Sequence, residues 1–152
     1  MAGLSVVVAV DGSKCANHAF QFYLNHFHRP EHHVTALYTT PPLLSTFYAT
    51  PHGIISPEIL NAFQQERDVQ VSKVRKSSEK IAKGITHFKF VHLSDIERPG
   101  VGIVNYVKDT KTDFVVIGTR GMGLVKRTIL GSVSDHVLHH VHVPVTVVSK
   151  EE

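Results

Sequence analysis

The chain has 152 residues, a formal net charge of +3 at pH 7 and a hydrophobic fraction of 42%, which is the composition of one globular domain and excludes wholesale disorder. Basic residues do not alternate with aromatic ones in a stripe, so we expect no nucleic-acid partner. The apolar run 6–10 ends at Asp11 and is too short for a membrane span or a signal peptide, and the single cysteine, Cys15, cannot form an intrachain disulfide. We therefore expect a cytoplasmic protein with no membrane partner.

The first elements are a strand, a helix and a second strand. Residues 4–10 are nearly all valine and alanine and predict a buried strand. Asp11-Gly12-Ser13 predicts a turn in which Ser13 caps the next helix. One face of that helix is apolar, with Ala16, Ala19, Phe20, Tyr23, Leu24 and Phe27 at helical spacing. A strand is predicted over 34–39, followed by a proline-rich loop over 40–56 with no regular period.

The second half continues the alternation. Ser56-Pro57-Glu58 predicts a helix start, and the long helix that follows should end near Gly84 with an apolar side formed by Leu60, Phe63, Val71, Val74 and Ile81. A strand is predicted over 85–93, a helix over 99–108 with Ile103, Val104 and Val107 inward, and strands over 114–117 and 144–149. A last helix should present Val133, Val137, Leu138 and Val141 on one face.

Alternating strands and helices, with strands apolar on both faces, predict a three-layer α/β domain. Helices should cover both faces of one five-stranded parallel sheet. Ligands of such folds bind beyond the carboxyl ends of the strands, where the strand order switches. We therefore expect the Asp11-Gly12-Ser13 turn and the turn at Gly118 to face each other across one crevice.

The turn after the fourth predicted strand contains the main motif of the chain. Gly118-Thr119-Arg120-Gly121 is followed, after nine residues, by Gly131-Ser132 and the predicted helix. Glycines let a phosphate approach the backbone, and a helix N-terminus offers unpaired N–H groups to an anion. Lys126 and Arg127 add positive charge, or are merely solvated. The spacing differs from that of the P-loop.

Each of these features also has a purely structural interpretation. Asp11 is a favoured turn residue, the glycines suit a tight turn, and Ser132 suits a helix start. Cys15 has no evident base beside it and is expected to pack as a small hydrophobic residue. The twelve histidines are scattered, and we interpret them as surface residues, although a zinc site built on His136, His139 and His140 is conceivable.

The chain resembles the universal stress protein family over nearly its whole length. The likeness includes residues 8–13, 36–39, 116–121, 131–134 and 144–148, and it includes the family's nucleotide-binding motif Gly-x2-Gly-x9-Gly-Ser/Thr without a gap. The resemblance implies strand order 3-2-1-4-5 and an ATP site in the switch-point crevice, with Mg²⁺ or Mn²⁺ on the phosphates.

The resemblance also assigns roles to residues. Asp11 would meet the adenosine, and Thr39, where an aliphatic residue is common in the family, would hold the adenine through its backbone. Gly121, Gly131, Ser132 and Val133 would bind the phosphates. The full set of nucleotide-binding residues that we expect is Val10, Asp11, Ser13, Thr39, Ile117, Gly118, Arg120, Gly121, Gly131, Ser132, Val133 and Ser134. We expect no catalytic residue and no protein metal ligand.

Three functions remain open at this point. The first is an ATP-binding stress-response or signalling module whose nucleotide state biases a dimer. The second is a slow Mg-dependent ATP hydrolase or phosphotransferase, in which Asp11 or Ser132 helps hold Mg²⁺ and Arg120 stabilises charge. The third, a nucleotide-free interaction protein, is disfavoured because the glycine motif is present.

The final strand is expected to form a homodimer. Val145, Thr146, Val147 and Val148 are β-prone, and in the implied strand order they lie at the edge of the sheet. The alternative is a monomer whose edge is protected by the charges of residues 150–152. The resemblance also favours a dimer through this segment.

Overall fold

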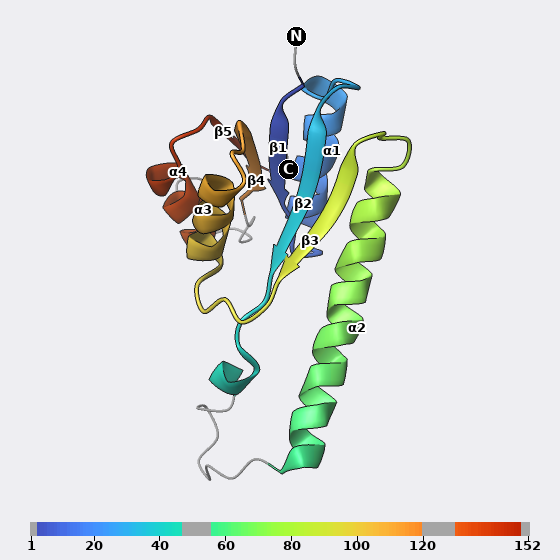
Figure 1. The fold of residues 1–152 in the computed structure, drawn as a ribbon, viewed down its shortest axis with the longest axis vertical. Coiled ribbons are helices and arrows are strands. Elements are labelled where there is room, and N and C mark those ends of the chain that lie inside the picture. Colours follow the sequence, from blue (N-terminus) through green and yellow to red (C-terminus); the bar gives the residue numbers. More distant parts are fainter. Residues whose placement is uncertain (1–2, 47–55, 120–129, 150–152) are drawn as a thin grey trace.

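A computed structural model describes residues 3–46, 56–119 and 130–149 (Figure 1). The elements follow one another as β1 (Ser5–Ala9), α1 (Lys14–His26), β2 (His33–Thr39), a 3₁₀ turn (Leu43–Thr46), α2 (Pro57–Ile81), β3 (Phe88–Leu93), α3 (Pro99–Asp109), β4 (Phe114–Gly118), α4 (Ser132–His140) and β5 (Val145–Val148). The five strands are parallel in the order β3-β2-β1-β4-β5, which confirms the fold class and the strand order.

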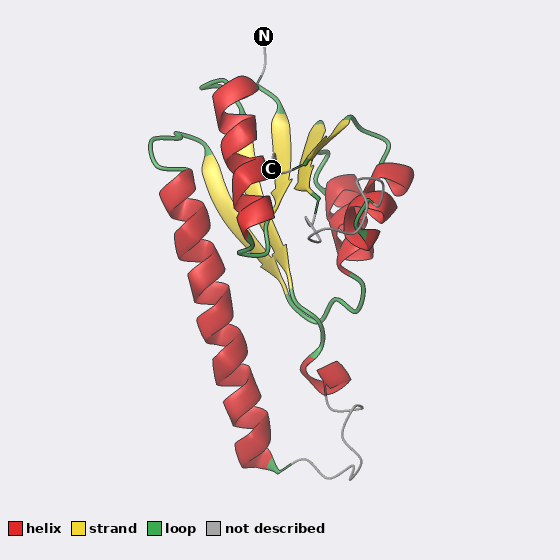
Figure 2. Cartoon of the chain, turned by 180° about the vertical axis from the view of Figure 1, so that it is seen from behind, coloured by secondary structure: helices red, strands yellow, loops and turns green. Residues whose placement is uncertain are grey.

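The sheet is buried because both of its faces are covered. Helices α1 and α2 lie on one face and α3 and α4 on the other (Figure 2). In β1, Val6 and Val8 pack toward α1 and α2, whereas Val7 between them packs toward α3. All three valines are at most 1% exposed. This is why the strands are continuous apolar runs rather than alternating ones.

The helix starts follow the predicted capping. The Ser13 hydroxyl accepts from the Ala16 N–H at 3.1 Å, and the Ser56 hydroxyl accepts from the Ile59 N–H at 3.4 Å. Each satisfies an N–H group that the first turn of a helix leaves unpaired. The predicted caps of α1 and α2 are therefore confirmed.

Several helix predictions need correction. Helix α1 ends at His26, so Phe27 is its C-cap and is 43% exposed rather than part of the buried stripe. In α4, Val137 is buried and Val133 and Val141 pack beside it as predicted, but Leu138 is 44% exposed. In α2 the buried positions are Val74 and Ser78, because the first turns of this helix extend beyond the sheet (Figure 1).

Two segment boundaries also differ from the prediction. Strand β3 begins at Phe88 rather than at residue 85, because the Ile85 N–H bonds back to the Ala82 carbonyl in the turn after α2. The segment after β2 contains the 3₁₀ turn, in which the Ser45 hydroxyl donates to the Pro42 carbonyl at 2.7 Å. Local side-chain hydrogen bonds of this kind do not appear as a hydrophobic period.

One histidine is buried, contrary to the expectation that all are surface residues. His32 is 6% exposed, and its Nδ1 lies 3.0 Å from the hydroxyl of Tyr23, which is fully buried. The same hydroxyl lies 3.3 Å from Nδ1 of His28. Burial raises the pKa of Tyr23 to about 12, so its hydroxyl remains protonated. The three side chains join the end of α1 to the start of β2.

We expect the Tyr23→Phe variant to be less stable by about 1–3 kcal/mol, because the buried His32 nitrogen would lose its partner. Urea unfolding followed by circular dichroism measures this. Tyr106→Phe is the matched control, since the Tyr106 hydroxyl has no hydrogen-bond partner among the described residues. Equal stability losses in the two variants would contradict the role of this network.

Candidate functional site

The ends of β1 and β4 meet, as predicted. The two strands are paired through Val8 and Val116, so the turns that follow them lie at the same edge of the sheet. In the turn after β1 the Asp11 Oδ1 accepts from the Ser13 N–H at 2.9 Å, and Gly12 has a φ of +79° that only glycine adopts easily. Asp11 therefore has the turn role that was its structural alternative, and one carboxylate oxygen is engaged in it.

Gly118 is required by close packing. A Cβ at this position would lie 2.7 Å from the carbonyl oxygen of Cys15 and 3.0 Å from its carbonyl carbon. The first turn of α1 therefore rests directly on the end of β4, backbone against backbone. This contact brings Asp11, Ser13 and Gly118 into one place.

The N–H and carbonyl of Thr39 lie beside the turn after β1 and have no backbone partner among the described residues. The last backbone bond that joins β2 to β1 runs from the Val10 N–H to the Leu37 carbonyl at 2.9 Å. Thr40 faces the other neighbour, where its N–H bonds to Leu93 at 2.9 Å. Because backbone groups alternate in direction along a strand, the N–H and carbonyl of Thr39 face the side where β1 has turned away. Within the described residues neither group has a backbone partner.

The start of α4 supplies further N–H groups. Gly131 is the N-cap, and no side chain of the described residues caps this helix. Ser132 is exposed, whereas Ser134 is 2% exposed and donates its hydroxyl to the Gly131 carbonyl at 2.9 Å. Val137, one turn further on, packs in the same core as Ile117. The first turn of α4 thus stands beside the end of β4.

Most of the expected nucleotide-binding residues therefore lie close to the carboxyl ends of the strands. Val10, Asp11, Ser13, Thr39, Ile117 and Gly118 lie at the ends of β1, β2 and β4, and Gly131, Ser132, Val133 and Ser134 lie at the start of α4. Arg120 and Gly121, like the basic Lys126 and Arg127, lie outside the described residues.

The conceivable histidine metal site gains no support from the described residues, in which no three His, Cys, Asp or Glu side chains are placed to hold a metal ion. The ring of His136 stacks on that of His140 at 4.0 Å between centroids, and Nδ1 of His139 lies 2.8 Å from the Asp135 carbonyl. A Cβ added at Gly100 would lie 3.0 Å from Cβ and Cδ2 of His136, so the His136 side chain packs α4 closely against α3.

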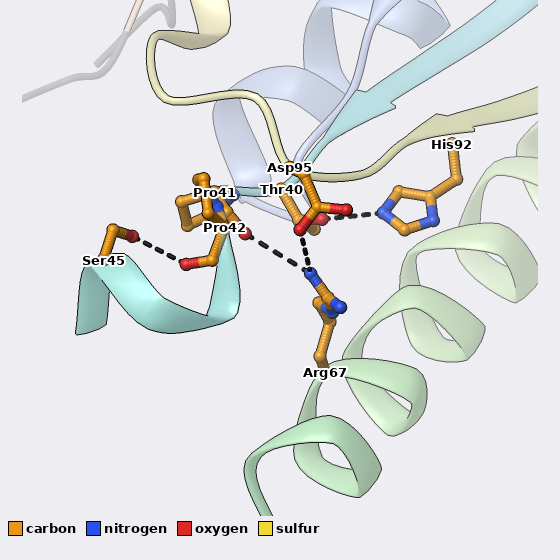
Figure 3. Close-up of polar contacts among 7 residues, drawn as sticks. All are labelled: Thr40, Pro41, Pro42, Ser45, Arg67, His92 and Asp95. Carbon is orange, nitrogen blue, oxygen red and sulfur yellow. Dashed lines mark hydrogen bonds and ion pairs between the residues drawn. The ribbon is translucent and has the colours of Figure 1, made fainter. Parts of the chain in front are cut away.

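A second polar cluster, which the sequence analysis did not single out, lies at the ends of β2 and β3 (Figure 3). Arg67 of α2 donates from Nη1 to the Pro41 carbonyl and to Asp95 Oδ1, both at 3.4 Å. The hydroxyl of Thr40, a buried residue, lies 2.8 Å from Nε2 of His92. These contacts join residues 26 to 52 positions apart, so no local pattern predicts them.

The pKa values of Tyr38 and His92 are shifted, chiefly by burial and then by nearby charges. Burial, with a smaller effect of the Asp11 carboxylate, raises the pKa of Tyr38. Burial and then the nearby Arg67 and Arg75 lower the pKa of His92, against a weaker opposing effect of Asp68 and Asp95. Tyr38 stacks on His92 with ring centroids 5.7 Å apart. The two rings whose pKa values shift thus lie side by side at the ends of β2 and β3.

The universal stress protein family model matches residues 4–149. The chain belongs to the universal stress protein family. A universal stress protein of Methanocaldococcus jannaschii is 29% identical over 146 residues, which cover 95% of this chain and 81% of that protein. The structure of a universal stress protein from Lactobacillus plantarum has a TM-score of 0.72 at 21% identity and covers 97% of this chain and 99% of that one.

Some structural neighbours in this family hold adenine nucleotides. One is a universal stress protein in complex with cAMP, with a TM-score of 0.69 at 18% identity, and another is an Arabidopsis thaliana protein with AMP bound, with a TM-score of 0.65 at 19% identity. Each matches at least 97% of this chain and at least 92% of its own. An Archaeoglobus fulgidus protein is in complex with dAMP. Among the described helices of our chain, none has the length and hydropathy that a membrane span needs.

The lowered pKa of His92 predicts a pH-dependent stability. In the unfolded chain His92 has its ordinary pKa near 6.5, whereas in the folded protein its pKa is lower. At pH values between these two, the unfolded chain binds more protons than the folded protein, so the free energy of unfolding should fall as pH falls from 7.5 to 5.5. In His92→Gln this fall should be smaller, and it should not vanish because His28 and His136 have lowered pKa values too.

Urea unfolding at pH 7.5, 6.5 and 5.5 measures the effect. Replacement of the exposed His18 by Gln is the control and should leave the pH dependence as in the wild type. The same pH dependence in His92→Gln and wild type would refute the assignment.

Proposed function

We propose that this protein is an ATP-binding stress-response or signalling module, in which nucleotide binding in the crevice between the ends of β1 and β4 biases a homodimer. The observation that supports it most directly is that the N–H and carbonyl of Thr39, beside the end of β1, have no backbone partner among the described residues. An adenine edge offers the matching acceptor and donor, so a backbone pair of this kind suits that ring without any particular side chain.

The start of α4 suits the phosphates. Its first N–H groups have no side-chain cap among the described residues, and the helix dipole favours negative charge there. By its resemblance to the family's motif, we assign Gly121, Gly131 and Ser132 to the same phosphates. The neighbours in complex with cAMP, AMP and dAMP support an adenine nucleotide as the ligand class.

A divalent ion in this proposal binds to the phosphate oxygens. The described residues offer no group of three His, Cys, Asp or Glu side chains for it. Mg²⁺ or Mn²⁺ commonly keeps several waters and binds through phosphates, so the protein need not supply a cage. Slow ATP hydrolysis or phosphotransfer is the second candidate, since Asp11 lies in the crevice and Arg120 belongs to the motif. The single cysteine supports a cytoplasmic setting.

Replacement of Gly131 by Val tests the phosphate site. Gly131 has φ −60° and ψ 149°, which any residue adopts, so the variant should fold with only a modest loss of stability. The added side chain should block the phosphates, and we expect at least a tenfold loss of ATP affinity by calorimetry in the presence of Mg²⁺.

The wild type must bind ATP with measurable heat for the proposal to stand, and wild-type affinity in Gly131→Val would remove the assigned phosphate site. Ser45→Ala, in the 3₁₀ turn, is the control for an unrelated change. Phosphate release by the wild-type protein, measured with the same samples, separates a binding module from a hydrolase.

The edge strand β5 supports the homodimer. The carbonyls of Pro144 and Val148 accept from β4 at 3.0 Å, so the N–H and carbonyl groups of Val145 and Val147 face away from the described sheet. A second copy related by a two-fold axis can pair with them in antiparallel fashion.

Val147→Pro should weaken this dimer about tenfold or more, because it removes an outward N–H from each copy. Proline is tolerated on an edge strand when its missing N–H would face outward. Val147→Ala is the matched control, which shortens the side chain but keeps the N–H. Light scattering at tens of micromolar measures the mass, and a wild-type monomer, or equal masses for the Pro variant and the wild type, would refute the interface.

A further inference from the structure

A cavity of about 540 Å³ lies outside the crevice, between α2 and the segment that follows β2. Its volume is in the range of small-molecule sites. None of the residues expected to bind the nucleotide lines it. The first turns of α2 extend beyond the sheet (Figure 1), and the cavity lies between this part of the helix and residues 40–43.

Four of the eleven residues that line the cavity have rings, and Leu43 and Val69 add aliphatic surface. Tyr38 lies at the end of β2, Pro41 and Pro42 follow it, and Phe63 projects from α2. Flat aromatic and proline rings pack well against another flat ring, and aromatic pairs add about 0.5–1.5 kcal/mol beyond the area they bury. The shape and lining therefore favour an aromatic ligand.

The charges of the lining favour a single negative group on that ligand. The charged lining residues are Glu66, Arg67 and Lys73, and Arg67 is already paired with Asp95, which lies just outside the lining, at 3.4 Å. Lys73 is exposed and has no ion pair or hydrogen bond within the described residues. A nucleoside triphosphate has several negative charges and matches this lining poorly, whereas a monoanion matches it.

Arg67 connects the segments that border the cavity. Its side chain is 18% exposed, and Nη1 ties α2 to the Pro41 carbonyl on one side and to Asp95 on the other (Figure 3). The guanidinium has five N–H groups, and within the described residues only those of Nη1 have partners. The remaining N–H groups can donate to a carboxylate or sulfonate.

We propose that this cavity is a second ligand site, which binds an aromatic small molecule that has one carboxylate or sulfonate group. The rings of Tyr38, Pro41 and Pro42 hold its apolar part, and Lys73 and Arg67 face its anionic group. None of the residues expected to bind the nucleotide lines this cavity, so the proposal does not depend on the proposed nucleotide function.

The probe for this site is 8-anilinonaphthalene-1-sulfonate, an aromatic monoanion whose fluorescence rises on binding to an apolar site. We expect saturable binding of one probe per chain to the folded wild type. Lys73→Glu should weaken the binding about fivefold to tenfold, because an attractive charge is replaced by a repulsive one. Lys76→Glu, an exposed lysine of the same helix that does not line the cavity, is the matched control and should leave the affinity unchanged.

A neutral analogue without the sulfonate, N-phenyl-1-naphthylamine, should bind Lys73→Glu and wild type alike. Circular dichroism confirms that each variant is folded. The proposal is overturned if the wild type shows no saturable binding of the sulfonate probe, if Lys73→Glu and Lys76→Glu have equal affinities, or if excess ATP with Mg²⁺ displaces the probe. A wild type that binds the probe as expected but binds no ATP would refute the proposed nucleotide function and leave this site in place.

Discussion

The sheet is covered on both faces, and this constraint decides where the protein can have chemistry. The interiors of β1, β2 and β4 are packed between helices, and the backbone groups along these three strands are paired in the ladders. Only at the carboxyl ends do neighbouring strands part, and there the backbone becomes available. Strand order 3-2-1-4-5 opens this gap between β1 and β4, because the chain leaves these two strands toward opposite faces. The crevice is therefore a result of topology before any side chain is considered.

The sequence predicted the elements well because burial leaves a strong local pattern. The valine run of β1 and the capping serines Ser13 and Ser56 needed no tertiary information. The exposure of Leu138 and Phe27 was not predictable in this way, since it depends on where α4 and α1 end and on what packs opposite them. The burial of His32 depends on a tyrosine nine residues away, so the composition alone gave no sign of it.

The candidate site, too, was predictable from the sequence only in part. The glycine motif and the turn at Asp11 were visible because they are contiguous, and the family supplied the role of Thr39. The physical reason for Thr39 became visible only with the register of β2 between β1 and β3, which leaves the N–H and the carbonyl of this residue without a ladder partner. The cavity beside α2 could not be predicted from sequence at all. It depends on the length of one helix and on contacts of Arg67 with residues 26 and 28 positions away.

The single hydroxyl of Tyr23 imposes a direction on its two histidine neighbours. A hydroxyl has one proton, so it can donate to Nδ1 of only one ring and must accept from Nδ1–H of the other. His28 and His32 therefore hold opposite tautomers whenever both are neutral. When His28 takes up a proton, its Nδ1 becomes a donor, and the Tyr23 hydroxyl must then turn its own proton toward His32. The charge of His28, which follows α1, thereby determines which ring nitrogen of the buried His32, just before β2, bears the hydrogen.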